Sequence, residues 1–150
     1  MNRFLFAIFL FSIMLSDIEA QDNAVHSGEQ LKVLISGFKN NRGMACVAVF
    51  NNSEAFPKSA NKAVATIYSK IVNNQSEAVF ENLSPGEYAV SVYHDENDNK
   101  KLDVNFLGIP KEGVGASNDA KGHLGPPKYQ DAKFMFKRGN ETISIKITYL

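Results

Sequence analysis

The sequence predicts an all-β protein, an antiparallel β-sandwich of about seven short strands with one long ordered loop. Two observations support this fold class. Apolar residues recur at every second position over short stretches, and no stretch sustains the 3.6-residue periodicity of a helix. Clusters of Asn, Gly and Pro separate these stretches, as turns do between strands.

The first twenty residues have the composition of a secretory signal peptide, predicted to span residues 1–20. Arg3 precedes an apolar run over residues 4–15, and Ala20 is a small residue suited to cleavage. The run is shorter than the roughly 20 residues of a membrane-spanning helix, which argues against a retained anchor. We therefore expect an exported protein, periplasmic or extracellular, with no transmembrane segment in its mature chain.

The mature chain is predicted to hold a polar, flexible lead-in at residues 21–29 and a single β-sandwich domain at residues 30–150. The full sequence carries 16 basic and 16 acidic residues, and removal of the signal peptide leaves the balance close to neutral. Nucleic-acid-binding proteins and polybasic membrane-surface proteins need a concentrated positive field, so both classes are disfavoured. Cys46, the only cysteine, has apolar neighbours and is predicted to be a buried, unreactive thiol.

The first half of the domain is predicted to contain four strands. Residues 31–38 alternate apolar and polar side chains, residues 43–50 are mostly apolar, and a turn signal at residues 40–43 predicts a hairpin between them. Because the second of these strands is apolar on both faces, it should lie centrally in its sheet. A crossing loop is expected at residues 51–61, and further strands at residues 64–72 and 77–80.

The second half of the domain is predicted to begin with a turn at residues 83–86 and a strand at residues 88–94. This strand places Tyr88, Val90, Val92 and His94 on one face and leads into the long loop. Two more strands are expected at residues 132–136 and 142–149, joined at Gly139-Asn140, a two-residue hairpin signal.

The long loop opens with side chains of the kind that bind calcium. Counted from Asp95 as position 1, Asn97, Asn99 and Asp103 occupy positions 3, 5 and 9 of an EF-hand-type loop, and Lys101 would contribute its backbone carbonyl at position 7. Such loops bind Ca²⁺ because hard cations prefer oxygen ligands. These five residues are the candidate metal site, and Ca²⁺ is the candidate cofactor.

Two positions depart from the calcium-loop pattern. Lys100 stands at position 6, where glycine makes the sharp turn, and Phe106 stands at position 12, where a glutamate binds with both oxygens. We therefore expect a shorter loop that takes its last ligands from elsewhere, with Glu112, Asp119 and Asp131 as candidates. The same Asp and Asn residues also form turns through their own side chains, so a metal-free loop is left open.

A hydrolytic interpretation has the weakest support. The residues that could serve it are His94, Asp95, Ser117, Asp119 and His123. The segment around Ser117 lacks the G-x-S-x-G pattern of a nucleophile elbow, and the three histidines lack metal-ligand spacing. No catalytic residue is therefore predicted, and His94 is expected to end a strand and bond to the loop that follows it.

An ordered series of motifs along the chain resembles an exported bacterial family, domain of unknown function 2141. The residues that carry this resemblance are residues 82–90, 94–97, 102–103, 108–113, 117–118, 125–127 and 131–132. The sequence departs from the family pattern at Lys100, where glycine is usual, and at Val114 and Ala116, where aromatic residues are usual. The resemblance implies export and a β-sandwich of the Ig-like, transthyretin-like or carboxypeptidase-regulatory-like kind, and it implies no established activity.

Two functions follow as expectations. The first is an exported, non-catalytic binding module with a calcium-stabilised Asp/Asn loop and a protein or a glycan as partner. The alternative is a metal-free structural accessory domain. Sensitivity to a chelator distinguishes the two.

Overall fold

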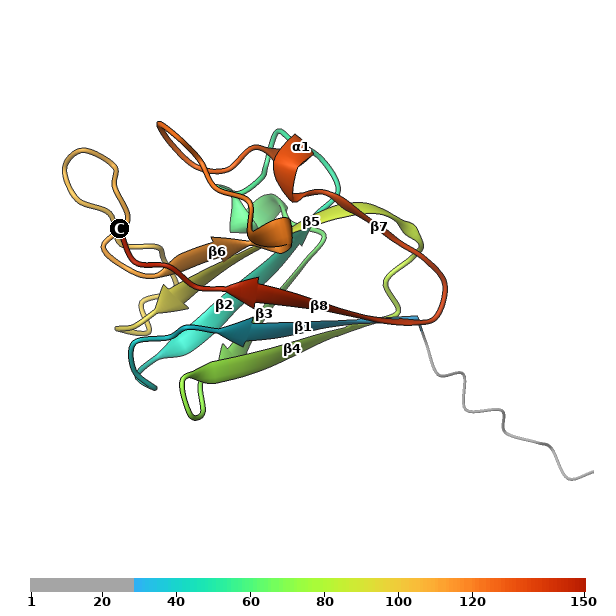
Figure 1. The fold of residues 1–150 in the computed structure, drawn as a ribbon, viewed down its shortest axis with the longest axis horizontal. Helices are drawn as coiled ribbons and strands as arrows, with labels where there is room; N and C mark the ends of the chain where they lie inside the picture. The colour runs from blue at the N-terminus through green and yellow to red at the C-terminus, as the bar shows by residue number, and fades with distance from the viewer. Residues whose placement is uncertain (1–28) are drawn as a thin grey trace, which may run out of the picture.

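The computed structural model describes residues 29–150, so the predicted signal peptide and nearly all of the lead-in lie outside the described residues. Eight strands form two sheets (Figure 1). The three-stranded sheet has the order β4-β1-β8, with β1 at Gln30–Ser36, β4 at Gln75–Glu81 and β8 at Asn140–Lys146. The five-stranded sheet has the order β3-β2-β5-β6, with β7 also paired to β5. The strands of this second sheet are β2 (Met44–Phe50), β3 (Ala65–Lys70), β5 (Gly86–Asp95), β6 (Val114–Ala116) and β7 (Phe134–Phe136).

The all-β prediction is confirmed, and the short helical segments lie in the connections. These are η1 (Ala60–Lys62), η2 (Ser117–Asp119) and α1 (Tyr129–Ala132). Among residues 29–150, no helix has the length and apolar character needed to cross a membrane. The strand that the sequence did not predict, β6, is three residues long and contains Gly115, so it shows no alternation to detect.

The main core lies between the two sheets. Alternate residues of β1, including Leu31 and Val33, pack with alternate residues of β2 and β5, including Val47 and Val90, in one buried cluster. The opposite face of β2 is also buried, under residues 55–63 and α1, in a second cluster that contains Phe50. The prediction that this strand is central is therefore confirmed, since β2 lies between β3 and β5.

Both predicted hairpins are wrong. β1 pairs with β4 and β8, and β2 pairs with β3 and β5, so the turn at residues 37–43 passes from one sheet to the other. Likewise β7 pairs with β5 while β8 pairs with β1, so Gly139 connects two sheets. Turn residues predict that the chain changes direction. They do not predict which strand the next segment pairs with.

The expectation of a wholly antiparallel fold is also wrong at one pair, because β1 and β8 are parallel. Parallel neighbours need a long connection, and these are the first and last strands, so the whole domain supplies it. β8 ends at Lys146, earlier than predicted. Beyond it, Ile147 remains buried and Thr148 forms an isolated bridge to Val114 of β6.

The longest strand, β5, positions the candidate site. Tyr88, Val90 and Val92 enter the core, as predicted, and the strand continues to Asp95. The chain returns to the same sheet at Val114, which pairs with Tyr93. Residues 96–113 are therefore an excursion from the end of β5, and together with Asp95 we call them the 95–113 loop.

Candidate functional site

The first turn of the 95–113 loop is organised by the carboxylate of Asp95. This side chain is fully buried, and its two oxygens accept hydrogen bonds from the backbone N–H groups of Asn99 (2.9 Å) and Lys100 (2.9 Å). One carboxylate at the end of β5 thus satisfies two backbone donors of the turn that follows. Asp95, which occupies position 1 of the calcium-loop pattern, is therefore positioned by the end of β5.

The other predicted ligand residues form a connected set in the same turn. The side-chain oxygen of Asn97 accepts from the backbone N–H of Asn99 (3.3 Å), and that of Asn99 accepts from Lys101 (2.8 Å). The amide nitrogens of both asparagines donate to the carboxylate of Asp103, at 2.7 and 3.1 Å. The structure therefore brings the five sequence-predicted site residues into one hydrogen-bonded loop.

Lys100 adopts the backbone conformation that the calcium-loop pattern reserves for glycine. Its φ is 65°, in the left-handed region, and that of Asp98 is 57°. The sharp turn at position 6 is therefore formed although its residue is a lysine. The ammonium group pairs with Asp98 and lies 4.6 Å from the ring centroid of Tyr68.

Glu112 closes the loop from its far end. Its carboxylate is buried and accepts from the backbone N–H groups of Glu96 (2.9 Å) and Asp103 (2.9 Å), so one side chain joins both ends of the excursion. The other two candidate ligands lie elsewhere. Asp119 accepts from the backbone of Lys146 on β8, and Asp131 is in α1. Only Glu112 of the three is bonded to the loop.

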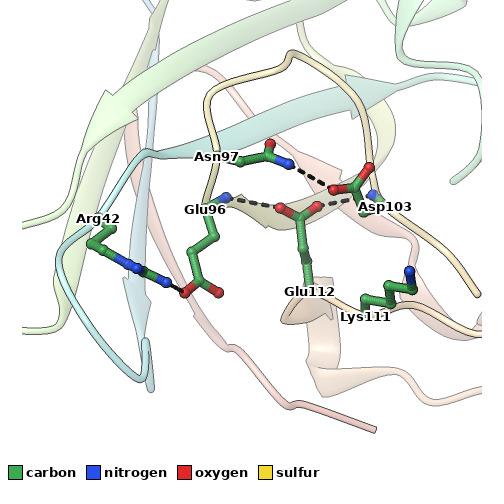
Figure 2. Close-up of a pocket in the computed structure, with 6 residues that line it drawn as sticks. All are labelled: Arg42, Glu96, Asn97, Asp103, Lys111 and Glu112. Carbon is green, nitrogen blue, oxygen red and sulfur yellow. Dashed lines mark hydrogen bonds and ion pairs between the residues drawn. The ribbon is translucent and has the colours of Figure 1, made fainter.

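A polar cavity of about 430 Å³ opens beside this arrangement (Figure 2). Its lining residues are Arg42, Glu96, Asn97, Asp103, Lys111 and Glu112. Glu96 contacts Lys39 (2.7 Å), Arg42 and Asn40 (3.1 Å), all from the turn between β1 and β2. The two cationic groups, first Lys39 and then Arg42, lower the pKa of the Glu96 carboxyl to about 2. Glu96 therefore lines the cavity as a carboxylate, and its side chain joins the 95–113 loop to the turn between β1 and β2.

His94 anchors the base of the loop to distant parts of the chain. The ring is buried, with Nδ1 2.7 Å from the Tyr149 hydroxyl and Nε2 2.7 Å from the carbonyl oxygen of Arg42. The expectation that this ring bonds to the loop it precedes is wrong, because both of its partners lie outside residues 95–113. Only the backbone N–H of His94 reaches that segment, at the carbonyl of Gly113 (2.8 Å).

The outer part of the loop is a small hairpin with an apolar tip. Asn105 N–H donates to the carbonyl of Ile109 (2.8 Å), and Gly108 N–H donates back to the carbonyl of Asn105 (2.9 Å). At its end Phe106 and Leu107 are exposed by 94% and 69%. These two side chains therefore do not anchor the loop by packing against the domain.

The residues of the hydrolytic interpretation do not share hydrogen bonds. The Ser117 hydroxyl is buried and bonds to the backbone of Val90 and Ala132, far along β5 from the ring of His94. His123 is exposed. The buried side chains of Ser117 and His94 thus each bond to segments that are distant in the sequence.

Cys46 is buried, as predicted, on the face of β2 where its strand neighbours are Tyr68 and Tyr93. Burial raises the pKa of the thiol, which keeps it protonated at neutral pH. Its environment is that of an unreactive cysteine.

Within residues 29–150, no group of three or more His, Cys, Asp or Glu side chains is arranged to hold a metal ion. An ion in the 95–113 loop would therefore need amide and backbone oxygens in addition to carboxylates. The loop offers these, because the side-chain oxygens of Asn97 and Asn99 each accept one N–H and an amide oxygen has a second lone pair. Each carboxylate oxygen of Asp103 accepts one amide N–H and likewise keeps a second lone pair.

Comparison with known proteins gives one match. The model of a family described as "Uncharacterized protein conserved in bacteria (DUF2141)" matches residues 33–144. Neither the curated proteins nor the solved structures contain a significant match. The matched segment includes most of both sheets, without the start of β1 and the end of β8, and the whole 95–113 loop.

Proposed function

The chain belongs to this family of uncharacterized bacterial proteins, DUF2141, and from that premise we propose that it is an exported, non-catalytic binding module whose 95–113 loop is stabilised by calcium. The observation that carries the proposal is the conformation of the loop. The left-handed turn at Lys100 forms without glycine, and hydrogen bonds join Asp95, Asn97, Asn99 and Asp103 within the same turn.

Glu112 supports the proposal from outside the first turn. The calcium-loop pattern lacks its glutamate at position 12, where the chain has Phe106, and Glu112 brings a buried carboxylate to Asp103 instead. The side chain is engaged by two N–H groups, so it would hold the loop closed around an ion and supply charge beside it. We expect weak binding, with a dissociation constant on the order of 10⁻⁴–10⁻³ M, as in extracellular calcium modules.

The alternative function, a metal-free structural accessory domain, is favoured by a specific observation. Every predicted ligand side chain already has hydrogen-bond partners within the loop, so the turn is closed without an ion. In that case the internal hydrogen bonds alone hold the turn, and calcium would add no stability. The two functions differ in one measurable property, the effect of calcium on stability.

Thermal unfolding of residues 21–150 in excess EDTA, followed by a calcium titration to about 10 mM, tests the proposal. We expect the melting temperature to rise with calcium and the rise to be lost in Asp103→Asn. Asp98→Asn is the matched control, because it removes the same charge from the same loop at a position outside the ligand pattern. If the parent shows no rise, or if both variants behave alike, the loop is a metal-free turn.

Export and the finer fold class are also proposals. Cleavage after Ala20 predicts that the exported protein begins at Gln21, which N-terminal sequencing of material from the periplasm or medium would detect. Recovery of the uncleaved chain in the cytoplasm would contradict it. The facing three- and five-stranded sheets support an Ig-like or transthyretin-like sandwich, and the strand order of an experimental structure tests this.

A further inference from the structure

Exposed apolar side chains are concentrated on the outer half of the 95–113 loop. Five of the eleven large apolar residues exposed in the described part of the chain lie between positions 102 and 109. They are Leu102, Val104, Phe106, Leu107 and Ile109. We call this group the apolar tip. Exposed apolar residues that cluster in one segment of the surface favour an interaction site there.

Hydrogen bonds hold the apolar tip away from the rest of the domain. The side-chain oxygen of Asn105 accepts from the backbone N–H groups of Leu107 (2.9 Å) and Ile109 (3.0 Å), inside the small hairpin closed by the backbone of the same residues. Lys111 N–H donates to the carbonyl of Asp103 (2.9 Å) at its base. The tip is thus an ordered hairpin with exposed apolar side chains, in which the backbone N–H groups of residues 105 and 107–109 are hydrogen-bonded internally.

The lysines and the carboxylates around the apolar tip differ in how far they are exposed. No charged residue lies between Asp103 and Lys111 in the sequence. At the base, Lys101 and Lys111 are exposed, whereas the carboxylates of Asp103 and Glu112 accept hydrogen bonds from within the loop. The exposed charged side chains next to the tip are therefore the two lysines, although the 95–113 loop as a whole carries five carboxylates and three lysines.

We propose that the apolar tip inserts into the interfacial layer of an anionic phospholipid bilayer, with Lys101 and Lys111 at the level of the phosphates. This inference deepens the proposed function, since it names the partner of the same loop and rests on that loop being the binding surface. It rests on three observations: an outward apolar tip, the exposed Lys101 and Lys111 next to it, and a hairpin whose N–H groups at residues 105 and 107–109 are bonded internally. Each of these suits a lipid surface.

The shape of the tip favours a lipid surface over the other partners. A convex hairpin needs a matching groove on a protein partner, whereas a fluid bilayer adapts to it. A glycan is bound through free polar groups, whereas the exposed side chains of the tip are apolar and the N–H groups of residues 105 and 107–109 are bonded internally. A protein partner is nevertheless a distinct outcome that the experiment below separates.

Flotation with vesicles tests the proposal in the full mature chain. The vesicles are phosphatidylcholine alone or phosphatidylcholine with 30% phosphatidylglycerol, at low and high salt, each with EDTA or calcium. We expect binding to the anionic vesicles, weakened by salt, and at least a tenfold loss of binding in the double variant Phe106→Ser, Leu107→Ser. Met135→Ser is the matched control, because Met135 is an exposed apolar residue on β7, which pairs with the opposite end of β5.

A second readout uses the absence of tryptophan from the sequence. Phe106→Trp places a single tryptophan at the apolar tip, and its emission should shift to the blue on binding to anionic vesicles. Met135→Trp should show no shift. Equal shifts in the two variants, or flotation of the serine double variant at the parent level, would overturn the proposal.

The outcomes separate this inference from the proposed function. A calcium-dependent rise in melting temperature without any vesicle binding would leave the calcium module standing and overturn the lipid partner, with a protein as the next candidate. Vesicle binding through the tip without a calcium effect on stability would support the lipid partner and remove calcium from the proposed function.

Discussion

His94 Nδ1 lies 2.7 Å from the hydroxyl of Tyr149, which ties the end of β5 to the last residues of the chain. The other ring nitrogen, Nε2, faces the carbonyl oxygen of Arg42 at 2.7 Å. A carbonyl can only accept, so Nε2 carries the proton and Nδ1 accepts from the tyrosine. Both ring nitrogens are therefore hydrogen-bonded, and the Tyr149 oxygen in turn accepts from Lys39 N–H (3.1 Å).

Tyr149→Phe removes the donor to a buried imidazole nitrogen. We expect the free energy of unfolding to fall by about 1–3 kcal/mol, the cost of leaving a buried polar atom unpaired. Urea unfolding measures this. Tyr129→Phe is the control, because the Tyr129 hydroxyl bonds to the carbonyl of Glu87 (3.2 Å), an exposed residue where water can replace it. Equal losses in the two variants would contradict the special role of His94.

Glu112→Gln tests the bridge across the 95–113 loop. The substitution keeps the shape of the side chain but replaces one of two accepting oxygens with a donor, which then faces the N–H of Glu96 or Asp103. We expect a loss of about 1.5–3 kcal/mol in unfolding free energy, typical of a hydrogen bond to a charged group. Hydrogen exchange should become faster at these two amides. Unchanged exchange there would mean that the bridge does not hold the loop.

Alternation in the sequence predicted most strands because side-chain period is a local property. β8 illustrates this, since Ile143 and Ile145 alternate with Thr142 and Ser144 and all four lie in the strand. Pairing partners are not local, which is why the parallel β1–β8 pair and the two sheet-crossing turns were missed. Residues 31–38 gave no sign that their neighbours would come from the middle and the end of the chain.

In the candidate site, too, the contacts that are local in the sequence could be predicted and the distant ones could not. The spacing of Asp95, Asn97, Asn99 and Asp103 predicted one loop, and their mutual hydrogen bonds lie within nine residues. Lys39, Arg42 and Tyr149 reach the base of that loop from both ends of the domain. Nothing in their local sequence indicates this role, because they are brought there by the crossing of the chain between the sheets.

Glu96 makes the free energy of unfolding depend on pH in the acid range. Its pKa is lowered from an ordinary value of 4.5 to about 2, first by Lys39 and then by Arg42, so the folded state binds a proton less readily than the unfolded chain. The contribution of the ion pairs is therefore fully present above about pH 4.5 and is lost as the pH falls through 2.

Glu96→Gln should remove this acid dependence. At pH 7 we expect a loss of about 1–2 kcal/mol in unfolding free energy, a modest value because the Arg42 side chain is 72% exposed and solvent screens it. The difference between parent and variant should shrink steadily as urea unfolding is repeated from pH 5 down to pH 2. Glu77→Gln, in the exposed pair with Lys32, is the control. A difference independent of pH would show that packing rather than charge is lost.

The turn at Lys100 provides a test of backbone strain in the 95–113 loop. A left-handed φ of 65° is unfavourable for a residue with a Cβ atom, and glycine relieves it. We expect Lys100→Gly to raise the melting temperature by roughly 2–4 °C, and Lys100→Ala to lower it, since alanine keeps the strain and loses the contacts to Asp98 and Tyr68.

Calcium titration of the same two variants separates charge from geometry. Both substitutions remove one positive charge beside the proposed ion, so both should strengthen calcium binding through reduced repulsion. Only Lys100→Gly also relieves the backbone strain of the turn. Its dissociation constant for calcium should therefore fall further than that of Lys100→Ala. If the two variants have the same melting temperature, strain at Lys100 is negligible. If they also bind calcium equally, the conformation at position 6 does not govern the loop's affinity for the ion.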